Sequence, residues 1–189
     1  MPPPLPTAAW SDEEILARLG EVIAGSLRLD PARVTRDATF SDLGAESLDL
    51  VEIPLDVELA FGILWPERHV LEIATEELAG SPVAAEGRVT ATGLALLRDR
   101  LPPSAFAALP AEPTVAHATA AFLRIDVWVQ VIRTLLEAAP RTCPTCGEAL
   151  VLGSPARVAC RRCGVEFDLL PGDEVNRAWI RRWQAPGHP

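Results

Sequence analysis

All four cysteines of this 189-residue chain lie between positions 143 and 163, as two C-x2-C pairs with 13 residues between them. A glycine follows the second cysteine of each pair, which lets the backbone turn so that both sulfurs of a pair face one ion. Thiolates are ligands that zinc prefers, and zinc takes four of them in a tetrahedral arrangement. The spacing therefore predicts a Zn²⁺ site formed by Cys143, Cys146, Cys160 and Cys163.

The interval between the two cysteine pairs has the composition of a β-hairpin. Leu150-Val151-Leu152 and Arg157-Val158-Ala159 flank a Gly-Ser-Pro turn, and a third strand is expected from Val165 to Leu169. The pattern resembles a zinc ribbon. With four protein ligands the site is closed, so we expect a structural zinc. A redox-active thiol pair and two disulfides stay open as alternatives, which bound metal would distinguish.

Ser47 is the second position that could do chemistry, in the stretch FSDLGAESLDLVEI from Phe40 to Ile53. A serine before an apolar periodic run usually caps the helix that follows. Its hydroxyl is also exposed at a helix N-terminus, where unpaired amides and the positive end of the helix dipole stabilise a phosphate. Gly44 permits the backbone turn before it. Ser47 can therefore be both a residue of the helix start and a point of attachment.

The residues around Ser47 resemble the acyl carrier protein family, in which the serine of a D-S-L motif carries a 4′-phosphopantetheine arm. The matching pattern, D-L-G-A-x-S-L-D-x-V-E, starts at Asp42 and is continued by a closing F-G-I at Phe61. The resemblance implies a four-helix bundle. It also implies that a phosphopantetheinyl transferase attaches the arm to Ser47 from coenzyme A, and that the arm presents acyl thioesters to enzymes of fatty-acid, polyketide or related biosynthesis. Glu46 stands where the family has aspartate.

A helix is expected from near Ser47 to Phe61, with a negatively charged face. It has Leu48, Val51, Leu55 and Leu59 on one side, while Asp49, Glu52, Asp56 and Glu58 mostly face water. Proline removes a helical hydrogen bond, so we expect a bend or a restart at Pro54. Acyl-activating or condensing enzymes with basic docking patches would suit such a surface. The expected docking residues are Glu46, Leu48, Asp49, Val51, Glu52 and Asp56.

The remaining segments predict a mainly α protein with a small β unit at its C-terminal end. A capping box at Ser11 and Glu14 opens a first helix over 12–24, and short helices are expected over 70–79 and 92–100. A helix over 125–138 is similar to the fourth helix of the carrier family, which makes about 67–122 an insertion. The alternative takes 92–100 as the fourth helix. A tail helix over 174–183 is expected to pack against the neighbouring domain.

We therefore expect three parts: a flexible proline-rich leader (1–9), an acyl-carrier-like helical domain (10–139), and a zinc ribbon with its C-terminal helix (140–189). The formal net charge of −9 disfavours general nucleic-acid binding. No stretch supplies about 20 unbroken apolar residues and the start lacks signal-peptide features, so we expect a cytoplasmic protein without a membrane partner. The predicted protein is a carrier and not an enzyme. The alternative is a helical adaptor that carries no acyl group and whose zinc ribbon binds protein or nucleic acid.

Overall fold

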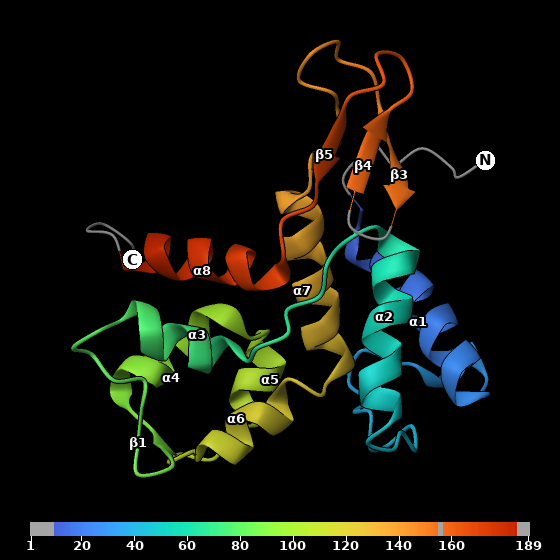
Figure 1. Cartoon of the computed structure of the whole chain (residues 1–189). Coiled ribbons are helices and arrows are strands. Elements are labelled where there is room, and N and C mark those ends of the chain that lie inside the picture. Colours follow the sequence, from blue (N-terminus) through green and yellow to red (C-terminus); the bar gives the residue numbers. More distant parts are fainter. Residues whose placement is uncertain (1–9, 155–156, 185–189) are drawn as a thin grey trace.

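The computed structural model describes residues 10–154 and 157–184, so the expected leader lies outside the described residues. Helices form most of the described structure (Figure 1). The helices are α1 (Asp12–Leu27), the 3₁₀ helix η1 (Pro31–Arg33), α2 (Asp49–Phe61), α3 (Val70–Glu77), α4 (Ala91–Arg100), α5 (Pro103–Ala107), α6 (Val115–Ala121), α7 (Ile125–Ala138) and α8 (Gly172–Trp183). The strands are β1 (Ala84–Ala85), β2 (Arg88–Val89), β3 (Leu150–Ser154), β4 (Arg157–Cys160) and β5 (Glu166–Asp168).

Helix α1 packs against both α2 and α7, and these three helices carry much of the hydrophobic core (Figure 1). The predicted capping box at the start of α1 is confirmed. The Ser11 hydroxyl accepts from the Glu14 amide at 3.2 Å, and the Glu14 carboxylate accepts from the Ser11 amide at 2.8 Å. The inward side chains of the three helices include Ile15, Leu19, Ile23, Ile53, Val57 and Ile132, each fully buried.

Helix α2 runs through Pro54 without interruption, so of the two expected outcomes, a bend or a restart, the restart does not occur. Its buried face consists of Ile53, Val57 and Phe61, which recur at four-residue intervals. The four leucine and valine residues that were expected on the side away from the acidic residues are also exposed. They are Leu48, Val51, Leu55 and Leu59, with 67%, 64%, 56% and 58% of their surface accessible. Helix α2 therefore has two apolar rows, of which only one faces the core.

The segment 67–122 contains α3 to α6 and the β1–β2 hairpin. The predicted short helices appear as α3 and α4, whereas the hairpin, α5 and α6 were not predicted. The antiparallel hairpin pairs Ala84 with Val89 and Ala85 with Arg88. Gly93 of α4 lies so close to the Val83 carbonyl that a methyl group there would overlap it. The segment is therefore packed and ordered, and it is not a simple extended loop.

Helix α8 lies across α3 and also touches α7 (Figure 1). It buries Val175 and Ile180 in the same hydrophobic cluster as α1, α2 and α7. The Arg181 and Arg177 guanidinium groups each reach Glu77 of α3 at 2.7 Å, and their hydrogen bonds lower the pKa of that carboxyl to about 2. The tail helix thus packs against the helical part of the chain, as expected.

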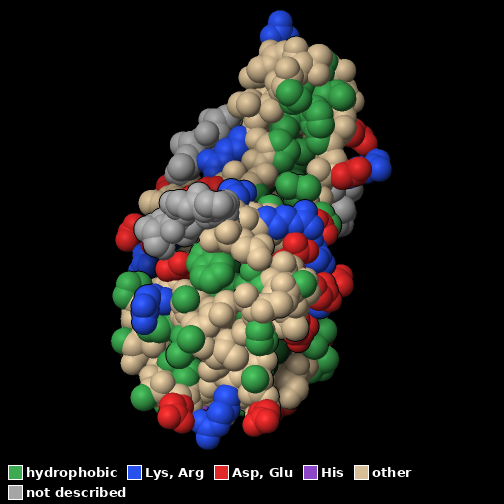
Figure 2. Space-filling model, turned by 90° about the vertical axis from the view of Figure 1, so that its left-hand side faces the viewer, with side chains coloured by type: hydrophobic (Ala, Val, Ile, Leu, Met, Phe, Trp, Pro, Cys, Tyr) green, Lys and Arg blue, Asp and Glu red, His purple; other side chains and the backbone are tan. Residues whose placement is uncertain are grey.

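Strands β3, β4 and β5 form an antiparallel sheet in that order. The predicted hairpin and third strand are both present. The sheet and the cysteine turns have a small core of their own, with Cys143, Leu150, Val158, Cys160 and Leu169 buried. In Figure 2 this unit forms the narrow upper lobe, and hydrophobic side chains gather on its visible face.

Candidate functional site

The loop before α2 is held in place from both sides. Phe40 is buried, its ring centroid lies 4.5 Å from that of Trp128 in α7, and its amide donates to the Leu123 carbonyl at 3.0 Å. The Asp42 carboxylate accepts from the amide and the hydroxyl of Thr39 at 2.9 and 2.7 Å, and these bonds lower the pKa of Asp42. The segment that leads to Ser47 therefore has a fixed path.

Ser47 is exposed in the turn directly before α2. Leu48 occupies the N-cap position without a side-chain cap bond, so the Ser47 hydroxyl does not cap the helix. The Asp49 carboxylate instead turns back and accepts from the Glu46 amide at 2.7 Å. Within residues 10–154 and 157–184, the amides of Ser47 and Leu48 have no acceptor. A phosphate on the serine would therefore meet unpaired N–H groups at the positive end of α2.

The six expected docking residues extend from the turn before α2 to the second half of the helix, but they are not equally free. Leu48 and Val51 are exposed, as are Glu46 and Glu52. Asp49 is occupied by the Glu46 amide, and Asp56 accepts from the Ser26 hydroxyl at 3.0 Å. Leu55 and Leu59 extend the exposed apolar row beyond the expected set. The accessible surface of α2 is thus more hydrophobic than the acidic pattern indicated.

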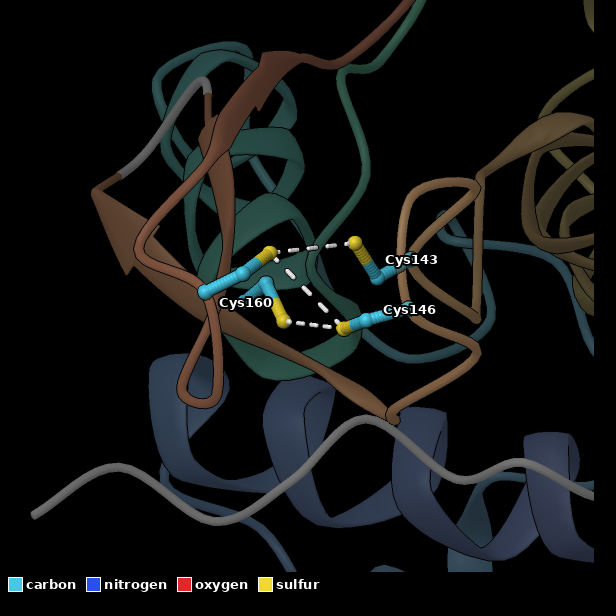
Figure 3. Close-up of side chains that lie close together, drawn as sticks. Cys143, Cys146 and Cys160 are labelled. Carbon is cyan, nitrogen blue, oxygen red and sulfur yellow. Dashed lines mark hydrogen bonds between the residues drawn. The ribbon is translucent and has the colours of Figure 1, made fainter.

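The four cysteines converge on one point between the two turns (Figure 3). All four sulfur atoms lie within 4.8 Å of one another, and three pairs are 3.4, 3.5 and 3.7 Å apart. Tetrahedral zinc with Zn–S bonds of about 2.3 Å requires sulfurs about 3.8 Å apart, so the set fits a metal ion. The sulfurs are too far apart for disulfides, whose S–S bonds measure about 2.05 Å, and the cysteines are free.

The two cysteine turns have the same backbone geometry. In each, the first cysteine's carbonyl accepts from the glycine four residues later, at 2.8 Å for Gly147 and 2.9 Å for Gly164. The two glycines have φ values of 74° and 72°, which other residues rarely adopt. The amides of such a turn point at the sulfurs. Burial raises the pKa of Cys143, but hydrogen bonds from the amides of Thr145 and Cys146, together with those from the Cys163 and Cys146 thiols, outweigh it and lower that pKa to about 6.

A cavity of about 230 Å³ lies beside α2 and was not anticipated from the sequence. Its wall includes Leu50 and Pro54 of α2, Phe122, and the rings of Trp65 and Trp128, which are tilted by 36° with centroids 4.3 Å apart. His69 and Arg100 also line it, and both were left without a role by the sequence pattern. The signal that could have found Arg100 is its place in α4, four and three residues after the fully buried Leu96 and Leu97.

Comparison with known proteins gives consistent matches to the region around Ser47. The family model for a phosphopantetheine attachment site matches residues 17–77. An acyl carrier protein of Rubrobacter xylanophilus is 44% identical over 68 residues, which are 35% of this chain and 84% of the relative. An acyl carrier protein of Guillardia theta is 37% identical over 70 residues, 36% of this chain and 86% of the relative.

A longer relative is covered less completely. The chloroplastic acyl carrier protein 5 of Arabidopsis thaliana is 38% identical over 80 residues, 42% of this chain and 58% of the relative. No solved structure matches the chain. The matched family model defines the class as proteins with a phosphopantetheine attachment site. The chain belongs to the acyl carrier protein family.

The described helices give no candidate for crossing a membrane, since none combines the necessary length with an apolar sequence. The family match ends at residue 77, and the segment α4 to α6, the cysteine turns and α8 all follow it in the chain.

Proposed function

We propose that the chain is an acyl carrier protein that holds an acyl group as a thioester on a 4′-phosphopantetheine arm attached to Ser47. The observation that carries the proposal is the exposed Ser47 hydroxyl, in a fixed turn at the start of α2 and inside the matched region. The serine oxygen forms a phosphodiester with the arm when a phosphopantetheinyl transferase transfers it from coenzyme A. The chain then carries the acyl group and does not transform it.

The surroundings of Ser47 suit the charge that modification adds. The phosphodiester is an anion, and the unpaired amides of Ser47 and Leu48 are donors at the positive end of the helix dipole. Glu46 is exposed beside it, so its carboxylate can turn towards water. These features favour attachment at Ser47 over attachment at another exposed hydroxyl of the loop.

The exposed row of α2 is the proposed docking surface for acyl-activating or condensing enzymes. Leu48 and Val51 supply apolar area, and Glu46 and Glu52 supply negative charge around it. A partner with a basic patch around a hydrophobic centre would complement both features. Asp49 contributes charge while it remains bonded to the Glu46 amide.

The other helices are assigned by their packing. Helix α7 packs on α1, and α4 is not among the elements in close contact with α1, so α7 is the proposed fourth helix of a carrier-like bundle with α1, α2 and α3. Residues from about 67 to 122 are then an enlarged third-helix region. The four cysteines hold a structural Zn²⁺, because their closed set of sulfurs leaves no position for substrate.

Intact-mass spectrometry tests the attachment directly. After incubation with coenzyme A and a broad-specificity transferase, the chain should gain the mass of one phosphopantetheinyl group, and Ser47→Ala should gain nothing. Ser41→Ala is the matched control, since Ser41 is another exposed serine of the same loop. An adduct that persists in Ser47→Ala, or none on the unaltered chain, would show that the proposal is wrong.

A further inference from the structure

The cavity beside α2 is lined about equally by the region of the family match and by later parts of the chain. Arg100 ends α4, Phe122 follows α6, and Asn176 lies in α8. Leu50 and Pro54 are three and seven residues after Ser47, which places them roughly 5 to 10 Å along the helix from it. The cavity therefore lies between the first half of α2, near the proposed attachment site, and the inserted and C-terminal segments.

Arg100 brings a buried positive charge to this cavity, with only 5% of its surface exposed. Its guanidinium donates to Asn176 Oδ1 at 3.2 Å and to Thr134 Oγ1 at 3.4 Å, and it lies 5.6 Å from the Trp179 ring. No carboxylate of the described residues pairs with it, and its Nε has no acceptor. Burial lowers the pKa of Arg100 to about 10, so the group remains charged at neutral pH. An ion in this position is costly unless an anion neutralises it.

His69 also lines the cavity and carries a second buried donor without a partner among the described residues. Its Nδ1 accepts from the Leu71 amide at 3.2 Å, so the proton of the neutral ring resides on Nε2. That nitrogen is buried and has no partner among the described residues. Both unpaired groups are donors, and the group that would satisfy either is an acceptor, above all a negatively charged oxygen.

Most of the remaining wall is apolar, and its other charged residues are either paired or exposed. Trp65, Trp128 and Phe122 present aromatic rings. Arg68 is paired with Glu76 at 2.7 Å, and Glu67 is exposed at the rim. The net electrostatic character of the interior is therefore set by Arg100.

We propose that this cavity binds an organic carboxylate, whose apolar body lies against the aromatic rings and whose charge neutralises Arg100. A cavity of about 150 Å³ holds benzene, so about 230 Å³ accommodates roughly nine non-hydrogen atoms. The size fits one aryl carboxylate or a short alkyl carboxylate. The acid can be free in solution, or it can be the distal carboxylate of an acyl group on the Ser47 arm.

The first experiment uses the unmodified chain with benzoate, and with benzamide as its neutral counterpart of equal size. Nuclear magnetic resonance titration should show benzoate binding at about 1 mM with a preference over benzamide of about tenfold or more. Arg100→Leu should abolish this preference, and Arg100→Lys should retain part of it. Arg98→Leu is the matched control, since it removes an exposed charge from the same helix. Equal affinity for the two compounds, or no binding of either, overturns the proposal.

The second experiment distinguishes a free acid from an acid tethered to Ser47, and only this experiment rests on the proposed function. The chain is loaded at Ser47 with glutaryl or with pentanoyl, which have the same number of carbons. If the tethered acid is the ligand, glutaryl should shift the Trp128 indole signal as benzoate does, and pentanoyl should not. If only benzoate shifts it, the ligand is a free acid. Ser47→Ala prevents loading but leaves benzoate binding unchanged, so failure of loading and failure of the cavity are distinguished.

Discussion

Lowering the pH should decrease the free energy of unfolding of the chain, because the buried His69 is uncharged in the folded state. The imidazole caps α3 through Nδ1, its Nε2 is buried, and its ring stands edge-on to Phe122 with centroids 4.6 Å apart. Burial lowers the pKa of His69 from 6.5 to about 4. His69 therefore binds a proton more weakly in the folded state than in the unfolded chain. The contribution of uncharged His69 to the free energy of unfolding is fully present above pH 6.5, and it is lost as the pH falls from there towards 4.

The size of the effect follows from the two pKa values. Between neutral pH and about pH 4.5, His69 alone should reduce the free energy of unfolding by about 2.5 kcal/mol. His69→Asn removes the titrating ring, and an asparagine oxygen can still accept the α3 amide. The variant should therefore lose about 2.5 kcal/mol less than the unaltered chain over the same pH interval.

Urea unfolding at the two pH values, followed by tryptophan fluorescence, measures this difference. Carboxylates and cysteine thiols also titrate in acid, but they are present in both proteins and cancel in the comparison. His117→Asn is the matched control, because the His117 ring also accepts a backbone amide at a helix start, that of Thr114 before α6, but His117 is exposed. An identical loss of stability in His69→Asn and the unaltered chain would refute the assigned burial of His69.

Two further predictions concern packing and metal. Gly172→Ala should destabilise the chain by about 1–3 kcal/mol, a fall in Tm of roughly 2–12 °C, because the new methyl would lie 2.7 Å from Pro66 Cδ and 2.8 Å from the Leu64 carbonyl. Gly25→Ala in α1 meets nothing within 4 Å and should instead stabilise by about 0.5–1 kcal/mol, so equal Tm values for the two variants would contradict the packing of α8. Elemental analysis should find one zinc per chain and none in Cys160→Ser. Chelation should remove hydrogen-exchange protection from β3–β5 and leave α1, α2 and α7 protected; uniform loss of protection would refute a separate metal-dependent unit.

The local elements were predictable where short-range chemistry decides them. Ser11 and Glu14 predict the start of α1, because a capping box needs only two residues that are three positions apart. The cysteine turns follow from C-x2-C-G for the same reason, and the hairpin between them from two short apolar stretches on either side of a Gly-Ser-Pro sequence. The region of Ser47 was identified by its resemblance, and the matches to acyl carrier proteins agree with it.

The sequence was less informative where two apolar rows compete for one core. Helix α2 carries Leu55 and Leu59 on one row and Ile53 and Val57 on another, and both have helical spacing. Helical periodicity cannot choose between them. Packing against α1 buries the second row and leaves the first in water.

By itself, the sequence determined the carrier-like motif around Ser47, the two cysteine turns and the helices that short-range capping defines, because these depend on residues within a few positions of one another. Only the tertiary structure decided that Arg100, His69 and Asn176 meet around one cavity beside α2. These residues come from α4, the start of α3 and α8, and their proximity depends on how those helices pack. A buried charge without a counter-ion is a property of that packing, and no pattern along the chain encodes it.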